Sequence, residues 1–516
     1  MVISDLPSLK QFFRERMRTP IFGVGVYAFD RVGLEDIISD YRLLALRYSL
    51  DTKIVEKTID VFSLEKGMGT KHIKMPRNST TVLTHSRTKE YLSRFEAPAL
   101  IVYKSSSKIE QVCRENNWTL VATPVKFGKE LLEDKIKFRK ILEEIGAQPP
   151  PGEVILVKNL NFYALESKYG LPFVLQHPRR GGGKGTFFIK SQEDWRNAIK
   201  KFRIHEKEGE EVAEDISRLE IVVTKYIKGP SPSITGCVTR RGILSTCPQY
   251  QLIDIPDLYN PQKGSGLFCG HDWSSSNFSE RILDQAYNSV EKIGNYFKTL
   301  GYRGIFGIDF ILDKNTQELY ITECNPRLLG SFPTLAMTQL QNNEPPILAF
   351  HLLEYLDIDY DLDIASVNNL MRQPKRGAHM FLHNLTGSWA RSSKAVKAGA
   401  YKLKVSAKGG SASGGKNQKS KIYYLKFIRS GYTLKHLKNK SEFLLTDGVL
   451  REKSFYSPNR RLCRIITKRR VLRKDKKTLT PWARRVVGAA HESFGLKKIR
   501  FVKLIRLFNH DYLAKG

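Results

Sequence analysis

Two apolar segments that each carry an acid constrain the fold of this chain most strongly. Residues 304–312 and 318–324 have the pattern of strands, and the polar residues 313–315 between them suit a tight turn. Asp309 lies in the first predicted strand and Glu323 in the second. A carboxylate within an apolar strand is costly unless it is paired or bound to a cation. The sequence therefore predicts an antiparallel hairpin with a functional acidic face.

Three side chains with oxygen atoms belong to this predicted face. Side chains alternate along a strand, so Glu323 and Asn325 point to the same side, and Asp309 on the neighbouring strand can join them. Oxygen donors of this kind suit Mg²⁺. Arg327, two residues further on, offers a planar fork that can hold a carboxylate or an acyl phosphate. The alternative interpretation is an ordinary hairpin with acids on the protein surface.

A glycine-rich stretch at residues 179–186 lies between two predicted strands. Gly182, Gly183 and Gly185 let backbone N–H groups approach phosphate oxygens, while Lys184 adds positive charge. The stretch does not have the Gly-x-x-x-x-Gly-Lys-Ser/Thr pattern of a P-loop. It predicts a loop that covers phosphates, with a plain hairpin turn as the alternative.

The first 130 residues alternate between predicted strands and helices. A helix is expected at 35–48, and residues 99–103, 108–116 and 118–122 follow the strand, helix, strand order of a parallel βαβ unit. A chain of 516 residues is too long for one hydrophobic core. We therefore expect roughly three domains, of which residues 1–130 form an N-terminal α/β domain.

The middle domain is expected at residues 131–362. A charged amphipathic helix over 131–145 runs into a Pro-Pro-Pro-Gly sequence that should end it. The glycine-rich stretch falls within a lid subdomain at about 172–228, and a strand at 219–227 and a long helix at 279–300 follow. This mixture predicts an α+β class.

Positive charge is concentrated in the last part of the chain. Residues 370–516 contain 37 Lys and Arg against 6 Asp and Glu, whereas residues 1–369 contain 48 against 46. We expect a basic, β-rich C-terminal domain at 363–516, with a flexible loop rich in Gly, Ser and Lys at about 404–421. Such a domain fits an anionic partner, either nucleic acid or an acidic peptide. A solvated basic surface is the alternative interpretation.

The cysteines and the apolar runs bear on the compartment. The six cysteines lack the spacing of zinc ligands, so we expect reduced, mostly buried thiols. The N-terminus has no apolar leader segment, and no run approaches the ~18 apolar residues of a membrane span. We expect a cytoplasmic protein without a membrane partner.

Several of these segments, taken together, resemble an enzyme of the ATP-grasp family. In chain order they are Asp134-Lys135 at a helix start, the glycine-rich stretch, the strand at 222–229, Asp309, and Glu323 with Asn325 and Arg327. The chain is most similar to the biotin-carboxylase-like variant of the family. The resemblance implies an ATP-grasp fold, with a Rossmann-like domain before it and a smaller domain after it.

The resemblance also implies roles for particular residues. The bound groups would be ATP and Mg²⁺ or Mn²⁺, with Arg327 as the catalytic residue beside the transferred phosphoryl group. The magnesium ligands would be Asp309, Glu323 and Asn325. The residues that would bind ATP are Lys135, Gln176, Gly182, Gly183, Lys184, Gly185, Thr224, Lys225, Tyr226 and Ile227.

Two positions depart from the family pattern. Gln176 stands where a lysine usually precedes the glycine loop, so a neutral amide replaces a positive charge, and Lys184, Arg179 or Arg180 would have to compensate. Thr224 stands where an acid is common, and the Gly-Pro-Ser-Pro-Ser that follows the strand lacks the usual ribose-binding carboxylate.

The function that the resemblance implies is an ADP-forming ligase. It would activate a carboxylate as an acyl phosphate and join it to an amine, with small molecules or peptides as substrates, so that a peptide bond is one of the products to expect. One alternative is an ATP-grasp kinase or carboxylase. The other is a non-catalytic ATP-binding protein that binds nucleic acid or another polyanion through its C-terminal domain.

Overall fold

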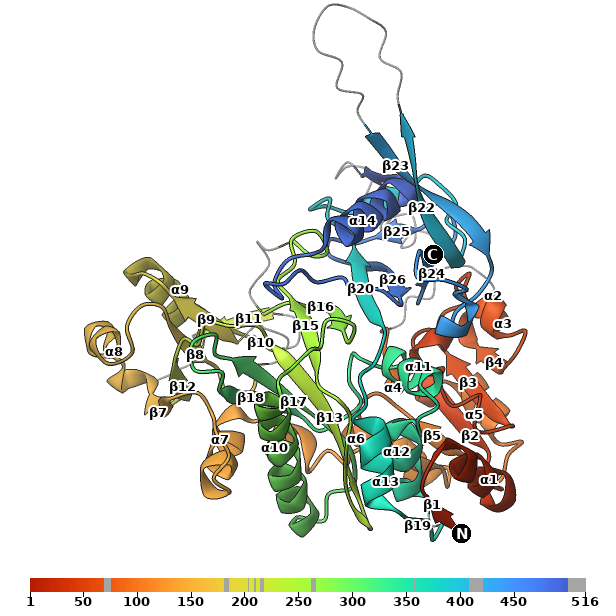
Figure 1. The fold of residues 1–516 in the computed structure, drawn as a ribbon, viewed down its shortest axis with the longest axis horizontal. Helices are drawn as coiled ribbons and strands as arrows, with labels where there is room; N and C mark the ends of the chain where they lie inside the picture. Colours follow the sequence, from red (N-terminus) through yellow and green to blue (C-terminus); the bar gives the residue numbers. More distant parts are fainter. Residues whose placement is uncertain are drawn as a thin grey trace, which may run out of the picture.

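The structure of this chain is a computed structural model. It describes residues 1–68, 76–180, 185–202, 204–207, 210–213, 218–260, 266–356, 358–407 and 421–499. Figure 1 shows a large body that holds both the N-terminal and the C-terminal segments, with a small lobe projecting from one side. The described residues mix helices and sheets, and this confirms the expected α+β class.

The N-terminal segment is built on a parallel sheet of five strands. Its order is β4 (Asp60–Ser63), β3 (Tyr41–Ala45), β2 (Ile21–Gly25), β5 (Ala99–Ile101) and β6 (Thr119–Val121). Apolar residues of α1 (Leu6–Arg16) pack on one face, and those of α4 (Ser79–Thr84), α5 (Ser86–Leu92) and α6 (Ser107–Glu115) pack on the other. The expected βαβ unit is therefore confirmed as β5, α6 and β6.

The helix expected at 35–48 is wrong. This stretch contains β3, which pairs in parallel with β2 on one side and β4 on the other. A strand covered on both faces is apolar at successive positions, as Leu43, Leu44 and Ala45 are here, and it loses the alternation that distinguishes a strand from a helix.

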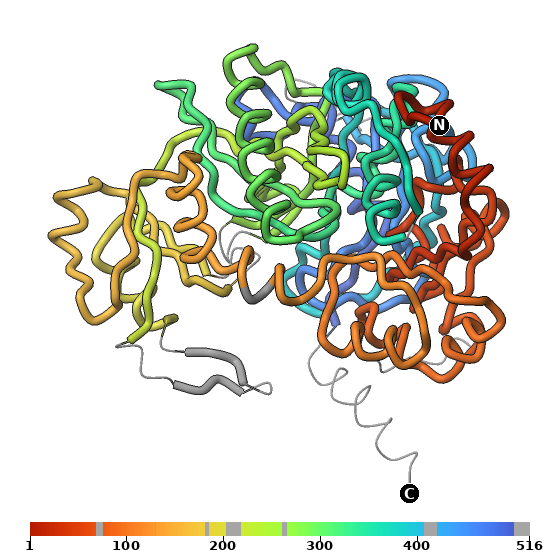
Figure 2. Tube along the Cα trace, turned by 90° about the horizontal axis from the view of Figure 1, so that it is seen from below, coloured from red at the N-terminus to blue at the C-terminus, as the bar shows by residue number. Residues whose placement is uncertain are grey.

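The small lobe contains an antiparallel sheet of four strands. Its order is β7 (Gly152–Leu156), β12 (Glu220–Lys225), β8 (Phe173–Gln176) and β9 (Thr186–Ile189), and α8 (Phe162–Tyr169) and α9 (Gln192–Phe202) pack on it. The hairpin of β10 (Ile204–Lys207) and β11 (Glu210–Ala213) follows α9. Figure 2 shows that this lobe stands to one side of the body when the molecule is seen from below.

One large sheet of eleven strands runs through the body. Ten strands follow one another in the order β18 (Leu319–Asn325), β17 (Gly304–Leu312), β13 (Pro232–Thr239), β15 (Gln249–Ile253), β16 (Phe268–Asp272), β20 (Ala378–His383), β26 (Arg461–Thr467), β24 (Glu442–Thr446), β22 (Gly399–Ala407) and β23 (Lys421–Arg429). The remaining strand, β14 (Gly242–Ser245), pairs with β13. The expected hairpin of acidic strands is β17 and β18, at one end of this sheet.

The remaining elements cover or extend these sheets. The helices are α2 (Thr52–Val55), α3 (Leu64–Met68), α7 (Lys135–Glu144), α10 (Glu280–Thr299), α11 (Thr334–Gln341), α12 (Ile347–Tyr355), α13 (Ile364–Met371) and α14 (Pro481–Phe494). The short strands are β1 (Val2–Ile3), β19 (Asp361–Leu362), β21 (Ala390–Ser392), β25 (Phe455–Tyr456) and β27 (Leu496–Lys498). The helices α7 and α10 share a core with β13, β17 and β18, so they support the acidic hairpin from behind.

The large sheet crosses the expected domain boundary at residue 362. His271 of β16 lies opposite His379 of β20, so strands from both sides of that boundary form one continuous sheet. The division of the chain into three domains stays a prediction. The flexible loop expected at about 404–421 is wrong at its ends, because residues 404–407 continue β22 and residue 421 begins β23. Its remaining residues lie outside the described part of the chain.

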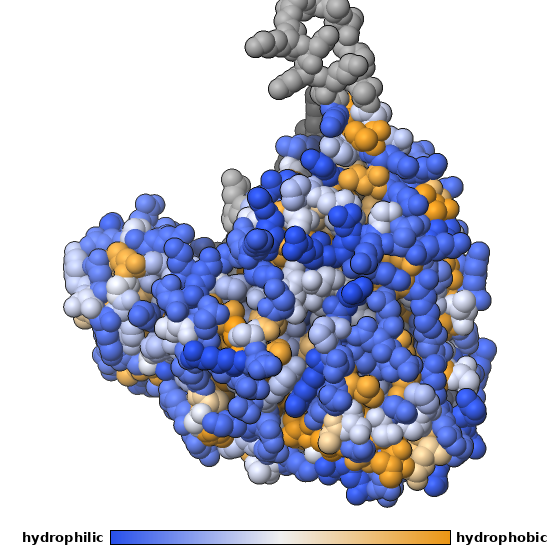
Figure 3. Space-filling model, viewed as in Figure 1, coloured by the Kyte–Doolittle hydropathy of each residue, from blue (hydrophilic) through white to orange (hydrophobic). Residues whose placement is uncertain are grey.

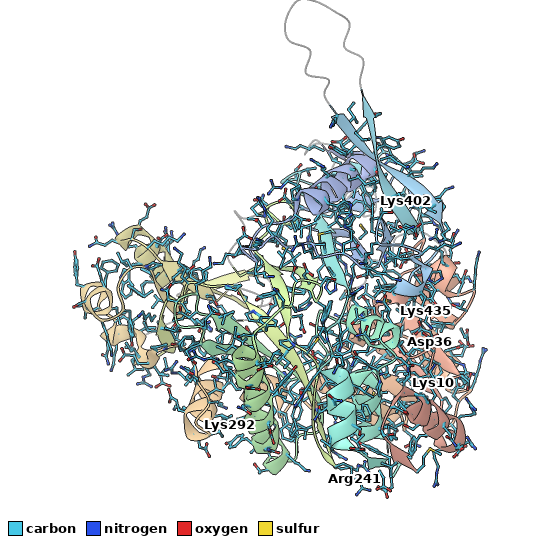
Figure 4. The ribbon with its side chains drawn as sticks, viewed as in Figure 1. Lys10, Asp36, Arg241, Lys292, Lys402 and Lys435 are labelled. Atoms are coloured by element: carbon cyan, nitrogen blue, oxygen red, sulfur yellow. The ribbon has the colours of Figure 1, made fainter. Side chains whose placement is uncertain are left out.

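An exposed ion pair joins the N-terminal segment to the C-terminal one, and further ion pairs lie within the C-terminal segment. Lys435 contacts Asp36 at 2.5 Å on the surface, where the two labels lie next to each other in Figure 4. In the interior, Asp447 binds Arg461 at 3.1 Å and Arg464 at 2.8 Å. Part of the positive charge expected to meet an anionic partner therefore has a partner within the chain.

The expectation of buried, reduced cysteines is confirmed, since all six are free and buried. Within the described residues, no helix is both long and apolar enough to cross a membrane.

Candidate active site

The two acidic strands bring the predicted metal ligands together. Asp309 of β17 lies opposite Glu323 of β18, and Gly307 lies opposite Asn325. The amide nitrogen Nδ2 of Asn325 donates a hydrogen bond to Oδ2 of Asp309 at 3.0 Å. The three oxygen-bearing side chains named from the sequence therefore share one face of the hairpin.

Asp309 also binds a residue that the sequence did not single out. Gln251 of β15 donates a hydrogen bond from Nε2 to Oδ1 of Asp309 at 2.7 Å. Burial, together with the negative charge of Glu323, raises the pKa of Asp309 to about 7, while the charge of Arg327 acts in the opposite direction. A cation bound at this face would stabilise the ionised form of Asp309.

The donor set fits a hard cation such as Mg²⁺. Two carboxylates and one amide oxygen are the kind of ligands that Mg²⁺ takes alongside water and nucleotide phosphates. Among the residues that the structure describes, no group of three or more His, Cys, Asp or Glu is placed to hold a metal. Asn325 and the phosphates of a nucleotide would therefore have to complete the coordination of Asp309 and Glu323.

Arg327 connects the hairpin to the N-terminal segment. Its guanidinium donates to Oδ1 of Asn325 at 2.6 Å and to the hydroxyl of Tyr103. Its Nε lies 3.6 Å from Oε1 of Glu133. Tyr103 and Glu133 were missed from the sequence, because each lies in a loop far from Arg327 along the chain.

Lys135 lies at the base of the glycine-rich stretch. It is buried at the start of α7, and its Nζ donates a hydrogen bond to the backbone oxygen of Arg180 at 3.0 Å. Asp134 caps the same helix and accepts a bond from Arg179 at 3.2 Å. The start of α7 therefore contacts the first residues of the glycine-rich stretch, and the role of Lys135 in binding ATP stays a prediction.

Of the glycine-rich stretch itself, Gly182, Gly183 and Lys184 lie outside the described residues. Gly185 is described, and its backbone oxygen accepts a hydrogen bond from the backbone N–H of His177 at 2.8 Å. The two ends of the stretch are thus held together across the strands β8 and β9.

Positive groups gather where Gln176 replaces the usual lysine. Gln176 donates from Nε2 to the hydroxyl of Thr186 at 3.4 Å. Burial lowers the pKa of the neighbouring His177 most, and together with the charges of Arg180, Lys135 and Arg179, in that order, it brings this pKa to about 4. These cations lie close enough to supply the charge that Gln176 lacks.

The predicted hinge strand joins the small lobe to the acidic hairpin. Thr224 is buried in β12 between Gly152 of β7 and Val174 of β8, Lys225 is exposed, and Ile227 is buried. The ring of Tyr226 meets Phe188 of β9 edge-on with centroids 5.7 Å apart.

Just after the predicted hinge strand, the backbone at Gly229 lies against the end of β17. A Cβ at Gly229 would lie 1.6 Å from the backbone oxygen of Leu312, at the end of β17. Only glycine permits this approach. Figure 3 shows the notch between the small lobe and the body as a largely hydrophilic surface.

The comparison with protein families identifies the class of this domain. Residues 132–331 match the family model of the ATP-grasp domain. This range includes α7, the small lobe, the acidic hairpin and Arg327. The chain therefore contains an ATP-grasp domain, as the resemblance in the sequence implied.

Curated relatives are similar to this chain at low identity. The D-alanine–D-alanine ligase of Carboxydothermus hydrogenoformans is 25% identical over 228 residues, which cover 41% of this chain and 65% of the ligase. The carbamoyl-phosphate synthase of Methanobrevibacter smithii is 26% identical over 303 residues, covering 58% of this chain and 69% of the synthase. The chain thus spans about two thirds of the length of these two relatives.

Solved structures support the fold over most of the chain. The biotin carboxylase domain of the Hydrogenobacter thermophilus 2-oxoglutarate carboxylase, solved with MgADP, ADP and bicarbonate, superposes with a TM-score of 0.51 at 13% identity. The alignment covers 88% of this chain and 87% of that one. Biotin carboxylase from Campylobacter jejuni gives the same TM-score at 12% identity, covering 88% and 89%. The predicted biotin-carboxylase-like architecture is confirmed.

Proposed function

We propose that this protein is an ATP- and Mg²⁺-dependent ligase that activates a carboxylate as an acyl phosphate and joins it to an amine. The observation that carries the proposal is the convergence of Asp309, Glu323 and Asn325 beside Arg327. The ATP-grasp match over the same residues and the ligases among the curated relatives support it.

In this proposal each described residue has a physical task. Asp309, Glu323 and Asn325 hold Mg²⁺, which when bound neutralises charge on the nucleotide phosphates. The amide oxygen of Asn325 has two lone pairs, so it can face the cation and still accept the bond from Arg327. Lys135 faces the phosphates at the base of the glycine-rich stretch.

The proposed reaction has two steps. A carboxylate oxygen of the substrate attacks the γ-phosphorus of ATP, and the bond from that phosphorus to the β,γ-bridging oxygen breaks to release ADP. An amine then attacks the carbonyl carbon of the acyl phosphate. The C–N bond forms, inorganic phosphate leaves with the pair of electrons from the C–O bond, and the amine gives up one proton.

Arg327 suits the first of these steps. It keeps its positive charge at any working pH, and its fork can face both the substrate carboxylate and the transferred phosphoryl group. The contacts to Asn325 and Tyr103 fix the guanidinium in one orientation. Charge that develops on the oxygens during transfer is stabilised by a group that needs no rearrangement.

The decisive experiment traps the acyl phosphate. The protein is incubated with ATP, Mg²⁺, hydroxylamine and a panel of carboxylic acids, and ADP, phosphate and hydroxamate are measured together. We expect hydroxamate in a one-to-one ratio with ADP for at least one acid. An isolable phosphorylated substrate would support the alternative of a kinase. Bicarbonate-dependent ADP release without hydroxamate would support a carboxylase.

Variants connect this activity to the site. Arg327→Lys keeps the charge but loses the fork, so we expect hydroxamate formation to fall by about a hundredfold or more while ATP still binds. Arg281→Lys is the matched control, because Arg281 is exposed and pairs with Glu318 at the other end of the hairpin. Equal rates for wild type and Arg327→Lys would contradict the assignment.

The basic C-terminal segment leaves room for an anionic substrate or partner. Its net positive charge would draw anions toward the body and raise the rate of association at low ionic strength. A filter-binding test with a single-stranded oligonucleotide and with polyglutamate, over 50 to 300 mM salt, separates a nucleic-acid partner from an acidic peptide. If neither ligand binds, the positive charge serves solubility alone.

A further inference from the structure

A small cavity opens between Arg327 and the loops of the N-terminal sheet. It has a volume of about 270 Å³, and Lys104, Glu133 and Arg327 are its charged lining residues. Pro124, Val125 and Pro326 contribute apolar surface. Sites for drug-sized ligands begin at about 300 Å³, so this cavity suits a small molecule rather than a nucleotide or a long peptide.

The cavity lies where a parallel sheet usually binds ligands. The chain runs from β2 to β3 and β4 on one side and then returns to β5 and β6 on the other, so the strand order reverses between β2 and β5. The segments that follow β5 and β6 line the cavity at the carboxyl ends of those strands. Crevices at such a reversal are the general ligand sites of open α/β sheets.

Cationic groups converge on the loop after β5. The guanidinium carbons of Arg31 and Arg327 lie 5.8 Å and 5.0 Å from the centroid of the Tyr103 ring. Arg31 is only 6% exposed, and its Nε has no hydrogen-bond partner. Of the cationic side chains near this loop, Lys104 and Arg327 line the cavity itself, and their two positive charges favour a carboxylate there.

Glu133 adds a negative charge to the cavity, so the cavity also favours a positively charged group. Both of its carboxylate oxygens accept bonds from the ammonium of Lys104, at 2.5 and 2.7 Å, and Oε1 lies 3.6 Å from Arg327. The alkylammonium of Lys104 shows the geometry in which Glu133 receives such a group. A purely anionic ligand would be repelled by Glu133, whereas a ligand with both charges would satisfy Glu133 and the cations together.

We propose that this cavity holds the carboxylate substrate as an α-amino acid, with Glu133 receiving its ammonium group and Arg327 facing its carboxylate. The statement that this amino acid is the substrate rests on the proposed ligase function. Lys104, whose side chain is 43% exposed, leaves Glu133 when the substrate arrives. The substrate carboxylate then lies beside Arg327, which also contacts Asn325 of the acidic face.

The test compares amino acids with the same acids lacking the amino group. Alanine, leucine and glutamate are paired with propionate, 4-methylpentanoate and glutarate. Binding to the protein with MgADP is measured by calorimetry, and ADP release with hydroxylamine is measured separately. We expect the amino acid of at least one pair to bind at least tenfold more tightly than its partner, because its ammonium group can form a charge-assisted bond to the half-buried Glu133.

Three variants make the test specific. Glu133→Gln keeps the size of the side chain but loses its charge, so the tenfold preference should disappear. Glu56→Gln is the matched control, because Glu56 also pairs with a lysine, Lys66 at 2.8 Å, but does not line the cavity. Lys104→Ala removes the competing ammonium, so amino-acid affinity should stay equal or rise. A fall with Lys104→Ala would indicate that the pair is only structural and would overturn the proposal.

The outcomes separate this proposal from the ligase function. If amino acids bind and Glu133→Gln abolishes the preference, the cavity assignment holds even when no acid gives ADP, and the ligase proposal fails. If acids without an amino group form hydroxamates as readily as amino acids do, the ligase function holds and the cavity assignment is overturned. Failure of the wild-type protein to bind any of the three amino acids also overturns it.

Discussion

Asn325 donates one amide hydrogen to Asp309 over 3.0 Å, so a hydrogen bond joins the two residues across the hairpin. The bond sets the distance between two of the three proposed magnesium ligands. It also leaves the Asn325 oxygen for Arg327. The acidic face is thus organised by hydrogen bonds within the chain, and binding of a cation has little left to rearrange.

Replacement of Asp309 by asparagine should abolish turnover while preserving the fold. The variant keeps the size of the side chain and can still accept from Gln251, but it removes one of two carboxylates. We expect ATP turnover to fall by about a hundredfold or more, as when a principal electrostatic group is lost. Circular dichroism should be unchanged. Turnover within threefold of wild type would exclude Asp309 as a metal ligand.

The affinity for Mg²⁺ should rise with pH up to about 7. The pKa of Asp309 is raised to about 7, mainly by burial, so below that pH the carboxylate carries a proton that must leave before a cation binds. Titration with Mn²⁺ from pH 5.5 to 8 should give affinity that increases up to about tenfold per pH unit and then levels off near pH 7. Asp309→Asn should show no such dependence.

In the metal-free protein, the raised pKa of Asp309 makes the free energy of unfolding fall as the pH rises. Because the pKa of Asp309 is higher in the folded protein than its ordinary value of 3.8, its contribution to the free energy of unfolding is fully present below pH 3.8. That contribution is lost as the pH rises through 7. Added Mg²⁺ should therefore raise the melting temperature more at pH 8 than at pH 5.5, and an equal effect at both values would contradict the raised pKa.

Removal of the Asp447 carboxylate should destabilise the protein strongly. Asp447 is buried and binds both Arg461 and Arg464, so Asp447→Ala leaves the buried Arg464 and the half-buried Arg461 without this carboxylate. We expect a loss of about 3 to 5 kcal/mol in the free energy of unfolding, measured by denaturant titration. Lys435→Ala is the control, because it breaks an exposed ion pair, that with Asp36, and should cost at most about 1 kcal/mol.

Gly229→Ala should disturb the hinge. The added Cβ would meet the backbone oxygen of Leu312 at 1.6 Å, so one of the two segments must move. We expect weaker ATP binding and a lower melting temperature. Gly488→Ala lies in α14, where no atom outside the adjoining backbone of the helix lies within 4 Å of the added Cβ, so it should be neutral or stabilise by up to about 1 kcal/mol. Similar melting curves for both variants would refute the close contact.

Local sequence patterns were sufficient to predict the acidic hairpin but not its surroundings. Asp309, Glu323 and Asn325 lie within one supersecondary unit, so alternation and a turn fix their common face. Gln251 reaches Asp309 only because β13 pairs with both β15 and β17. Tyr103 reaches Arg327 only because the N-terminal segment packs against the residues that follow β18. Neither contact has a signature in the local sequence.

The C-terminal basic segment shows a different kind of limit. Its net charge follows directly from its composition, and composition alone predicts a separate domain. Composition does not record that β20 pairs directly with β16, or that Arg461 and Arg464 form ion pairs with the buried Asp447. Backbone pairing across 100 residues of chain is invisible to any local property.

The pairing of β16 with β20 has a consequence for any shortened form of this protein. A chain cut at residue 362 would expose the backbone N–H and C=O groups of β16 along an open edge, next to the apolar Phe268 and Cys269. Unprotected edges of this kind recruit strands from other molecules. A truncated protein that retains every residue proposed to bind ATP would therefore be prone to self-association, and its precipitation would say nothing about the chemistry of the site.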